Sequence, residues 1–190
     1  ASELEGYHYA AVIGGGAGCA IAYPQAKALH ALGAKVDMIA GFRNQDIIIL
    51  EDEMKAASDQ LYLMTDDGSN GHKGFVTDAL KQKIENGAKY DLVVAIGPLP
   101  MMKAVCNLTK EYGIKTIISM NSIMIDGTGM CGGCRVTVGG ETKFACVDGP
   151  DFDGHLVDFD EVMKRAKTYA ELEKESTREF NCRLMKQAEQ

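Results

Sequence analysis

Short apolar segments alternate with helix-like segments over the first 119 residues, and this alternation restricts the possible folds more than any other feature of the sequence. Such alternation is typical of a parallel sheet with helices on both faces. The predicted strands comprise residues 9–13, 35–40, 60–64, 91–96 and 115–119. The predicted helices between them comprise residues 19–32, 46–57, 75–86 and 101–112. We therefore predict an α/β fold built on a five-stranded parallel sheet.

A glycine-rich loop follows the first predicted strand and precedes the first predicted helix. It contains Gly15, Gly16, Ala17 and Gly18, whose small size lets the backbone approach a pyrophosphate at the N-terminus of the helix. Strand, glycine loop and helix in this order indicate a Rossmann-like sheet that binds a dinucleotide. In such sheets the ligand lies beyond the carboxyl ends of the strands.

Three further loops at the same predicted edge of the sheet supply the other candidate nucleotide contacts. These candidates are Arg43, Thr65, Asp66, Asp67, Gly97, Pro98 and Met101. Arg43 follows the second strand, where NAD-binding domains usually carry a carboxylate. Its guanidinium suits the 2′-phosphate of NADP, and a solvated loop charge is the equal alternative. Met101 is either a nicotinamide contact or part of the core, so the choice between NAD and NADP stays open.

An aspartate and three cysteines form a metal-binding pattern between residues 126 and 146. The residues are Asp126, Cys131, Cys134 and Cys146, in the spacing D-x4-C-x2-C-x11-C. This spacing follows the plant-type [2Fe-2S] loop, with aspartate in place of its first cysteine. The intervening glycines permit the turns with which a backbone wraps a cluster. A zinc site with the same four ligands is the main alternative, and a disulfide or plain core is a weaker one.

The residues after Cys134 explain how the distant Cys146 returns to the same place. Residues 135–138 and 141–146 predict a β-hairpin with a two-glycine turn at residues 139–140. If Val138 pairs with Glu141, Cys134 lies opposite Ala145 and Cys146 lies beside it. We therefore expect three thiolates and one carboxylate to converge on a single point.

Composition excludes several classes of function. The net charge of −7 argues against a nucleic-acid-binding surface and against unaided docking of an acidic electron carrier. The sequence has no apolar run of about 20 residues and no signal peptide, so we expect a cytoplasmic protein without a membrane span. Cys19, Cys106 and Cys182 lie in apolar or helical contexts, and we interpret them as structural. The four histidines show no spacing that indicates a metal site or a catalytic dyad.

The chain after the hairpin predicts one long helix. Asp158 and Glu161 have the positions of an N-cap and a capping-box carboxylate, and the helical pattern continues to about residue 187. We expect this helix to close the domain or to meet a partner. Residues 1–119 are thus expected to form an NAD(P)-binding domain, residues 120–157 a cluster-binding loop and hairpin, and residues 158–190 a C-terminal helix.

Five motifs together resemble the ferredoxin–NADP reductase superfamily over about residues 2–170. They are GGGAGCAIAYP at residues 14–24, GFRNQD at 41–46, TDDGS at 65–69, AIGPLPMM at 95–102 and the cluster loop. Within the superfamily the chain looks most like the small (alpha) subunits of NADH-dependent reduced ferredoxin:NADP oxidoreductases, also known as sulfide dehydrogenase small subunits. The electron-transfer subunits of dihydroorotate dehydrogenase are close relatives with four cysteine ligands, so Asp126 favours the former branch.

The resemblance implies an electron-transfer subunit that carries a [2Fe-2S] cluster, NAD(P) and, on an N-terminal β-barrel, FAD. The chain is expected to begin just past that barrel, and therefore to lack full activity alone. The resemblance also implies a large flavin and iron–sulfur partner subunit through which ferredoxin is reached. It places the pyrophosphate near Gly15–Gly18 and the nicotinamide near Gly97, Pro98 and Met101. A non-enzymatic nucleotide-binding module with structural zinc is the alternative from another class.

Overall fold

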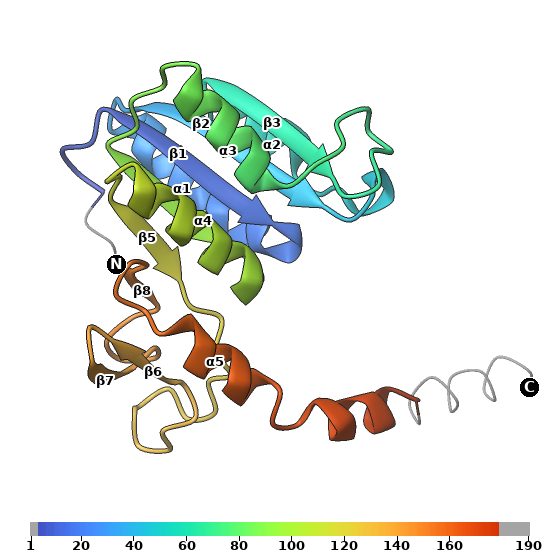
Figure 1. Ribbon diagram of the computed structural model, residues 1–190, viewed down its shortest axis with the longest axis vertical. Coiled ribbons are helices and arrows are strands. Elements are labelled where there is room, and N and C mark those ends of the chain that lie inside the picture. Colours follow the sequence, from blue (N-terminus) through green and yellow to red (C-terminus); the bar gives the residue numbers. More distant parts are fainter. Residues whose placement is uncertain (1–3, 179–190) are drawn as a thin grey trace, which may run out of the picture.

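The computed structural model describes residues 4–178, which form a mostly parallel α/β layer joined to a smaller unit (Figure 1). The central sheet has the strand order β3-β2-β1-β4-β5-β8. Its parallel strands are β1 (Tyr9–Gly15), β2 (Lys35–Phe42), β3 (Gln60–Thr65), β4 (Leu92–Ile96) and β5 (Thr116–Ser119). The five predicted strands are therefore confirmed. The sixth strand, β8 (Asp151–Asp153), pairs antiparallel with β5 and was not predicted, because three residues are too few to show a periodic pattern.

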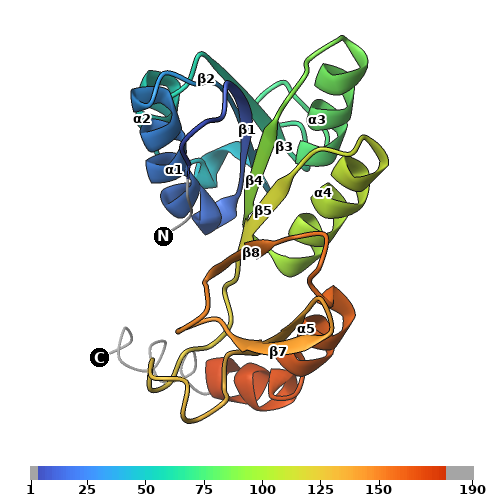
Figure 2. The same ribbon diagram turned by 90° about the vertical axis from the view of Figure 1, so that its left-hand side faces the viewer.

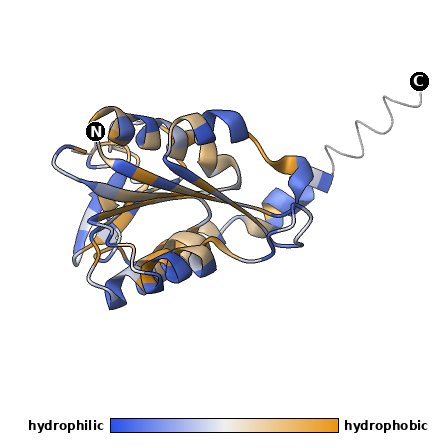
Figure 3. Cartoon of the chain, turned by 90° about the horizontal axis from the view of Figure 1, so that it is seen from above, coloured by the Kyte–Doolittle hydropathy of each residue, from blue (hydrophilic) through white to orange (hydrophobic). Residues whose placement is uncertain are grey.

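Helices cover both faces of this sheet, as predicted (Figure 2). One face carries α1 (Cys19–Ala31) and α2 (Glu51–Ala56), and the other carries α3 (Val76–Glu85) and α4 (Leu99–Glu111). Every residue of β4 is buried, as expected for a strand covered from both sides. Figure 3 shows apolar residues following the strands between the two helix layers. The strands therefore supply the middle of two apolar cores, one on each face.

One charged side chain lies inside this core. Asp37 of β2 is almost fully buried, and its Oδ2 accepts hydrogen bonds from the hydroxyls of Tyr9 at 2.8 Å and Tyr90 at 2.7 Å. The ammonium of Lys83 lies 4.0 Å from the same oxygen. These donors compensate a carboxylate that would otherwise be expensive to bury. Its Oδ1 has no hydrogen-bond partner among the described residues.

The predicted helix over residues 46–57 is interrupted. A 3₁₀ turn, η2 (Gln45–Ile47), comes first, and α2 begins only at Glu51. Ile47, Ile48 and Ile49 are β-branched and favour extended backbone, and Ile48 and Leu50 pack against the core. Leu50 has a φ of 57°, which lies in the left-handed region. The backbone turns there so that α2 can start in a new direction.

The smaller unit contains a two-stranded hairpin and a helix. β6 (Arg135–Val138) and β7 (Glu141–Phe144) pair with Val138 opposite Glu141, so the predicted register is confirmed. α5 (Phe159–Ala166) is capped by Asp158, whose side chain accepts from the amide of Glu161 at 3.0 Å. This confirms the predicted N-cap.

The predicted long C-terminal helix is interrupted after α5. Residues 167–169 form turns, residues 170–178 are helical again, and the predicted end near residue 187 lies outside the described residues, as does Cys182. None of the helices in the described part of the chain is both long and apolar enough to pass through a bilayer.

Candidate cofactor-binding sites

A cavity of about 1070 Å³ opens at the carboxyl ends of the parallel strands, which is at the upper end of the range for small-molecule sites. Loops after β1, β2, β3 and β4 form its wall. Predicted site residues in that wall are Gly15, Gly16, Ala17, Gly18, Arg43, Asp66, Gly97, Pro98 and Met101. The structure therefore brings together nine residues from four loops that are far apart in the sequence.

The loops after β1 and β4 touch, and this contact requires glycine. A Cβ atom on Gly18 would lie 2.5 Å from the carbonyl oxygen of Ile96 and 2.9 Å from the Cα of Gly97. A Cβ on Gly15 would lie 2.5 Å from the sulfur of Met101. These separations are shorter than a van der Waals contact. The atoms that face Gly18 are backbone atoms and cannot move aside as the Met101 side chain can, so the approach of the two strand ends depends on glycine at position 18.

The glycine turn that leads into α1 is the helical start that faces an anion. This 3₁₀ turn, η1 (Gly16–Gly18), runs directly into α1, and the amide of Cys19 already donates to the carbonyl of Gly16. The first amide groups of a helix have no partner within the helix, and the helix dipole adds partial positive charge there. A pyrophosphate therefore has both a close approach and hydrogen-bond donors at this edge of the cavity.

The loop after β3 divides the predicted site residues. Asp66 lines the cavity, whereas Thr65 and Asp67 do not. Thr65 is buried and donates through its hydroxyl to Oδ1 of Asn70 at 2.7 Å. Asp67 accepts from the amide and hydroxyl of Ser69, which lowers the pKa of its carboxyl. Thr65 and Asp67 thus shape the loop, and Asp66 is the member that faces the cavity.

Several cavity residues escaped the sequence analysis. Phe75 stands directly before α3 and is 64% exposed, so its ring is an open aromatic surface at the rim. The other unpredicted wall residues are Ile21, Gly41, Phe42, Ile47, Gly74, Val76, Thr77, Ile96, Pro100, Ala104, Ser119, Met120, Asn121, Met124 and Pro150. The sequence signal for Phe75 is its position directly before α3, six residues after the TDDGS motif at residues 65–69. Residues 119–124 have no such sequence signal, because their position in the cavity wall depends on the direction in which the chain leaves β5.

Asp126 organises the loop that carries the first two cysteines. Its Oδ1 accepts from the amide of Thr128 at 2.9 Å, and its Oδ2 accepts from the amide of Cys131 at 2.7 Å. The Thr128 amide is the main cause of a lowered pKa for this carboxyl, and the Cys131 amide adds to it. Gly127, Gly129 and Gly132 have positive φ angles of 73°, 83° and 65°, which lets this short loop turn around the carboxylate.

The hairpin brings Cys134 and Cys146 together. The amide of Cys146 donates to the sulfur of Cys134 at 3.4 Å, and the amide of Ala145 donates to the carbonyl of Cys134 at 3.1 Å. Burial opposes ionisation of Cys134, but hydrogen bonds from Cys146 outweigh it and lower the pKa of this thiol. The amide of Gly133 likewise donates to the sulfur of Cys131 at 3.4 Å. Two of the predicted ligand sulfurs therefore already accept backbone N–H groups.

The four predicted ligands form two neighbouring pairs. Asp126 adjoins Cys131, and Cys134 adjoins Cys146. The pKa of Cys146 is raised by its hydrogen bond to Cys134, with a smaller contribution from the charge of Asp126, so the pairs are close to each other. Within residues 4–178, however, no three His, Cys, Asp or Glu side chains are grouped closely enough to hold one metal ion. The convergence of the four predicted ligands on a single centre therefore stays a prediction.

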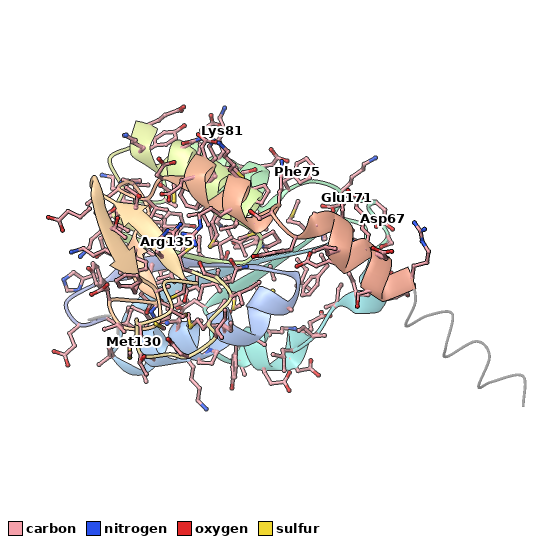
Figure 4. The ribbon with its side chains drawn as sticks, turned by 90° about the horizontal axis from the view of Figure 1, so that it is seen from below. Asp67, Phe75, Lys81, Met130, Arg135 and Glu171 are labelled. Atoms are coloured by element: carbon pink, nitrogen blue, oxygen red, sulfur yellow. The ribbon has the colours of Figure 1, made fainter. Side chains whose placement is uncertain are left out.

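This pairing bears on which group would fit. Structural zinc requires four ligands arranged tetrahedrally around one ion, whereas the described ligands stand as two pairs. A two-iron cluster takes its four ligands as two pairs, one on each iron. Two pairs of ligands and amides directed at sulfur suit the larger group. Figure 4 shows Met130 and Arg135 on this loop and hairpin, well away from Phe75 at the rim of the nucleotide cavity.

Taken together, a dinucleotide cavity and a cysteine-rich loop on one chain define a class, the NAD-binding electron-transfer proteins. Residues 12–107 match the family described as oxidoreductase NAD-binding domain, and residues 121–158 match the iron-sulfur cluster binding domain of dihydroorotate dehydrogenase B. The chain belongs to the oxidoreductase NAD-binding domain family, with the iron–sulfur binding domain joined to it.

Individual relatives agree with this assignment. The chain is 50% identical over 179 residues to a Thermotoga maritima protein named dihydroorotate dehydrogenase B (NAD(+)), electron transfer subunit homolog, covering 94% of this chain and 63% of that protein. It is 56% identical over 158 residues to an uncharacterized Clostridium beijerinckii protein encoded in the adh 3′ region, covering 83% and 53%. A chain from the structure of an NADH-dependent reduced ferredoxin-NADP oxidoreductase matches with a TM-score of 0.86 and 44% identity, covering 94% and 64%. The chain thus spans about half to two thirds of these relatives.

Proposed function

We propose that this chain is part of the electron-transfer flavoprotein subunit of an NAD(P)H and ferredoxin oxidoreductase complex. The observation that carries the proposal is the shared wall of the nucleotide cavity. Arg43, Gly97 and Met101 come from the nucleotide-binding sheet, whereas Met124 comes from the segment that enters the cysteine loop two residues later. A nucleotide in this cavity would therefore lie beside the chain segment that carries the metal ligands.

Each part of the cavity has a role in this proposal. Gly15, Gly16, Ala17 and Gly18 bind the pyrophosphate through the backbone amides of the glycine turn that leads into α1. Gly97, Pro98 and Met101 hold the nicotinamide against the strand ends. The exposed ring of Phe75 offers the adenine a surface for stacking, and Arg43 offers a bidentate contact to a 2′-phosphate.

Asp126, Cys131, Cys134 and Cys146 are proposed to hold a [2Fe-2S] cluster. Asp126 is ionised and fixed by two amides, and Cys134 is the thiol whose pKa is lowered, so both are prepared to bind a cation. When bound, the cluster supplies a one-electron carrier and FAD supplies exchange between electron pairs and single electrons. FAD is proposed for the complete subunit, outside the residues described here.

The proposed partner is a large flavin and iron–sulfur subunit, through which ferredoxin is reached in the cytoplasm. The family match to residues 121–158 and the Thermotoga relative favour a second candidate, in which the partner oxidises dihydroorotate. The activity of the complete subunit, purified with its native partner, distinguishes the two candidate functions. Reduction of NAD(P) by ferredoxin supports the first, and reduction by dihydroorotate supports the second.

The test of the site uses the chain prepared anaerobically, with Cys134→Ser and a control variant, Cys106→Ser. Cys106 is a buried thiol of α4 outside the loop. We expect iron and acid-labile sulfide in the wild type and in Cys106→Ser, and their loss from Cys134→Ser. Iron and visible absorbance retained by Cys134→Ser would contradict the assignment. Zinc in a colourless wild-type protein would support the nucleotide-binding module with structural metal instead.

A further inference from the structure

We infer that Arg165 is a positioning residue for the proposed cluster, an inference that rests on the proposed function. Its guanidinium reaches from the last turn of α5 to the loop between Cys131 and β6. Nη1 donates to the carbonyl of Arg135 at 2.8 Å, and Nη2 donates to the carbonyls of Gly133 at 3.2 Å and Gly132 at 3.5 Å. The bonded carbonyls lie on both sides of Cys134.

These bonds complete the hydrogen bonding of the backbone around Cys134. The carbonyl of Cys134 itself accepts from the amide of Ala145, so four consecutive carbonyls, at residues 132–135, all have donors. The segment contains two adjacent glycines, one with a φ of 65°, and glycine backbones have more conformational freedom than any other. Arg165 therefore restrains the part of the loop that sets the distance between Cys131 and Cys134.

The helix that carries Arg165 is itself held in place. Phe159 and Val162 of α5 are buried in the core, and Lys103 of α4 forms an ion pair with Asp160 at 2.7 Å. Just before α5, the amide of Asp158 donates to the carbonyl of Thr137 on β6 at 2.9 Å. A residue on a fixed helix keeps its donors in place whether or not the loop holds a metal.

The charge of Arg165 is not neutralised by a carboxylate. No carboxylate of residues 4–178 lies within 4.0 Å of its guanidinium nitrogens, and the side chain is half-buried. Its hydrogen-bond partners are carbonyl oxygens, which leave the full positive charge in place. A fixed positive charge favours the more negative, reduced state of a nearby redox centre. Arg165 should therefore raise the reduction potential of the proposed cluster, as well as restrain residues 132–135.

Lysine cannot replace both functions. The planar guanidinium directs several N–H groups in fixed directions and can bond to three carbonyls at once, whereas an ammonium is a compact point charge. Arg165→Lys keeps the charge and loses the fork, and Arg165→Gln loses both. Lys164→Gln is the matched control, because Lys164 is an exposed cation on the same helix and its removal changes the net charge equally.

The experiment measures three quantities in the anaerobically prepared chain: the midpoint potential, the rate of iron loss to a chelator, and deuterium exchange at the amides of residues 132–135. We expect Arg165→Gln to lower the midpoint potential of the cluster and to lose iron about ten- to a hundredfold faster, because removing a partner of a metal ligand typically lowers metal affinity by that factor. Arg165→Lys should keep a potential close to the wild-type value and still lose iron faster. Lys164→Gln should match the wild type in all three.

Equal potentials and equal rates of iron loss in Arg165→Gln and Lys164→Gln would overturn the inference. If Arg165→Gln does not fold, the comparison of Arg165→Lys with Lys164→Gln decides it through the rate of iron loss. If the wild type binds no iron and sulfide, the proposed function fails. The role of Arg165 in holding the loop is then decided by deuterium exchange in the metal-free chain, where unchanged protection of residues 132–135 in Arg165→Lys would refute it.

Discussion

Gly18→Ala should weaken nucleotide binding because it forces apart the two loops that close the cavity. The φ of Gly18 is −61°, which alanine adopts without strain, so the effect is purely steric. The new Cβ would lie 2.5 Å from the carbonyl oxygen of Ile96 and 2.9 Å from the Cα of Gly97. Both are backbone atoms that cannot rotate away. An ordinary contact of about 3.4 Å requires the end of β4 to move by about 0.9 Å.

Overpacking of this kind costs about 1–3 kcal/mol, which corresponds to a fall in Tm of about 2–4 °C per kcal/mol for a domain of this size. Gly97 also lines the cavity, so the movement of the end of β4 also displaces the residues proposed to contact the nicotinamide. If half of a mid-range cost, about 1 kcal/mol, is expressed in binding, the Kd for nucleotide rises about fivefold.

The assay is calorimetric titration with NADH and NADPH, together with thermal unfolding. Ala20→Gly is the control, because Ala20 is exposed on the first turn of α1 and outside the cavity wall. It should lose up to about 1 kcal/mol through helix propensity and bind nucleotide like the wild type. Wild-type affinity in Gly18→Ala would refute the requirement for glycine at this contact.

The remaining predictions concern the buried carboxylate and the choice of nucleotide. Tyr90→Phe removes a hydrogen bond to Asp37 and should lower the free energy of unfolding by about 1.5–3 kcal/mol, whereas exposed Tyr112→Phe should change it little. Burial and the Asp37 carboxylate raise the pKa of Tyr90 above its value in the unfolded chain. The contribution of Tyr90 to the free energy of unfolding is therefore fully present below pH ~10 and declines at higher pH. In denaturant titrations, Tyr90→Phe should lose less stability than the wild type as the pH rises above this value. Arg43→Gln should weaken NADPH binding about tenfold more than NADH binding, and equal effects would show that Arg43 does not contact the 2′-phosphate.

The nucleotide-binding part could be predicted from the sequence because its signals are local. Each parallel strand is an apolar run bounded by turn residues, and the order of elements determines which loops share an edge. Arg43, Asp66 and Gly97 therefore appear together at the cavity as predicted. Thr65 does not, because the side chain of a strand's last residue points to one face or the other, and here it bonds to Asn70.

The cluster unit was predictable in its hairpin and less so in its assembly. The pairing of Val138 with Glu141 followed from a two-glycine turn and is confirmed. The arrangement of Asp126 and Cys131 depends on a glycine loop with several positive φ angles, for which spacing gives order but not distance. The role of Arg165 had no signal in the sequence, because its bonds to residues 132–135 join elements about 30 residues apart.

We propose, above all, that Asp126, Cys131, Cys134 and Cys146 hold an iron–sulfur centre beside a nucleotide cavity. The most direct test of this proposal is quantification of iron and acid-labile sulfide in the anaerobically purified chain, with an electron paramagnetic resonance spectrum after reduction. We expect iron and sulfide in equal amounts and a spectrum of a reduced [2Fe-2S] cluster. A chain that contains zinc, or no metal, and gives no such spectrum after anaerobic reconstitution with iron and sulfide would contradict it.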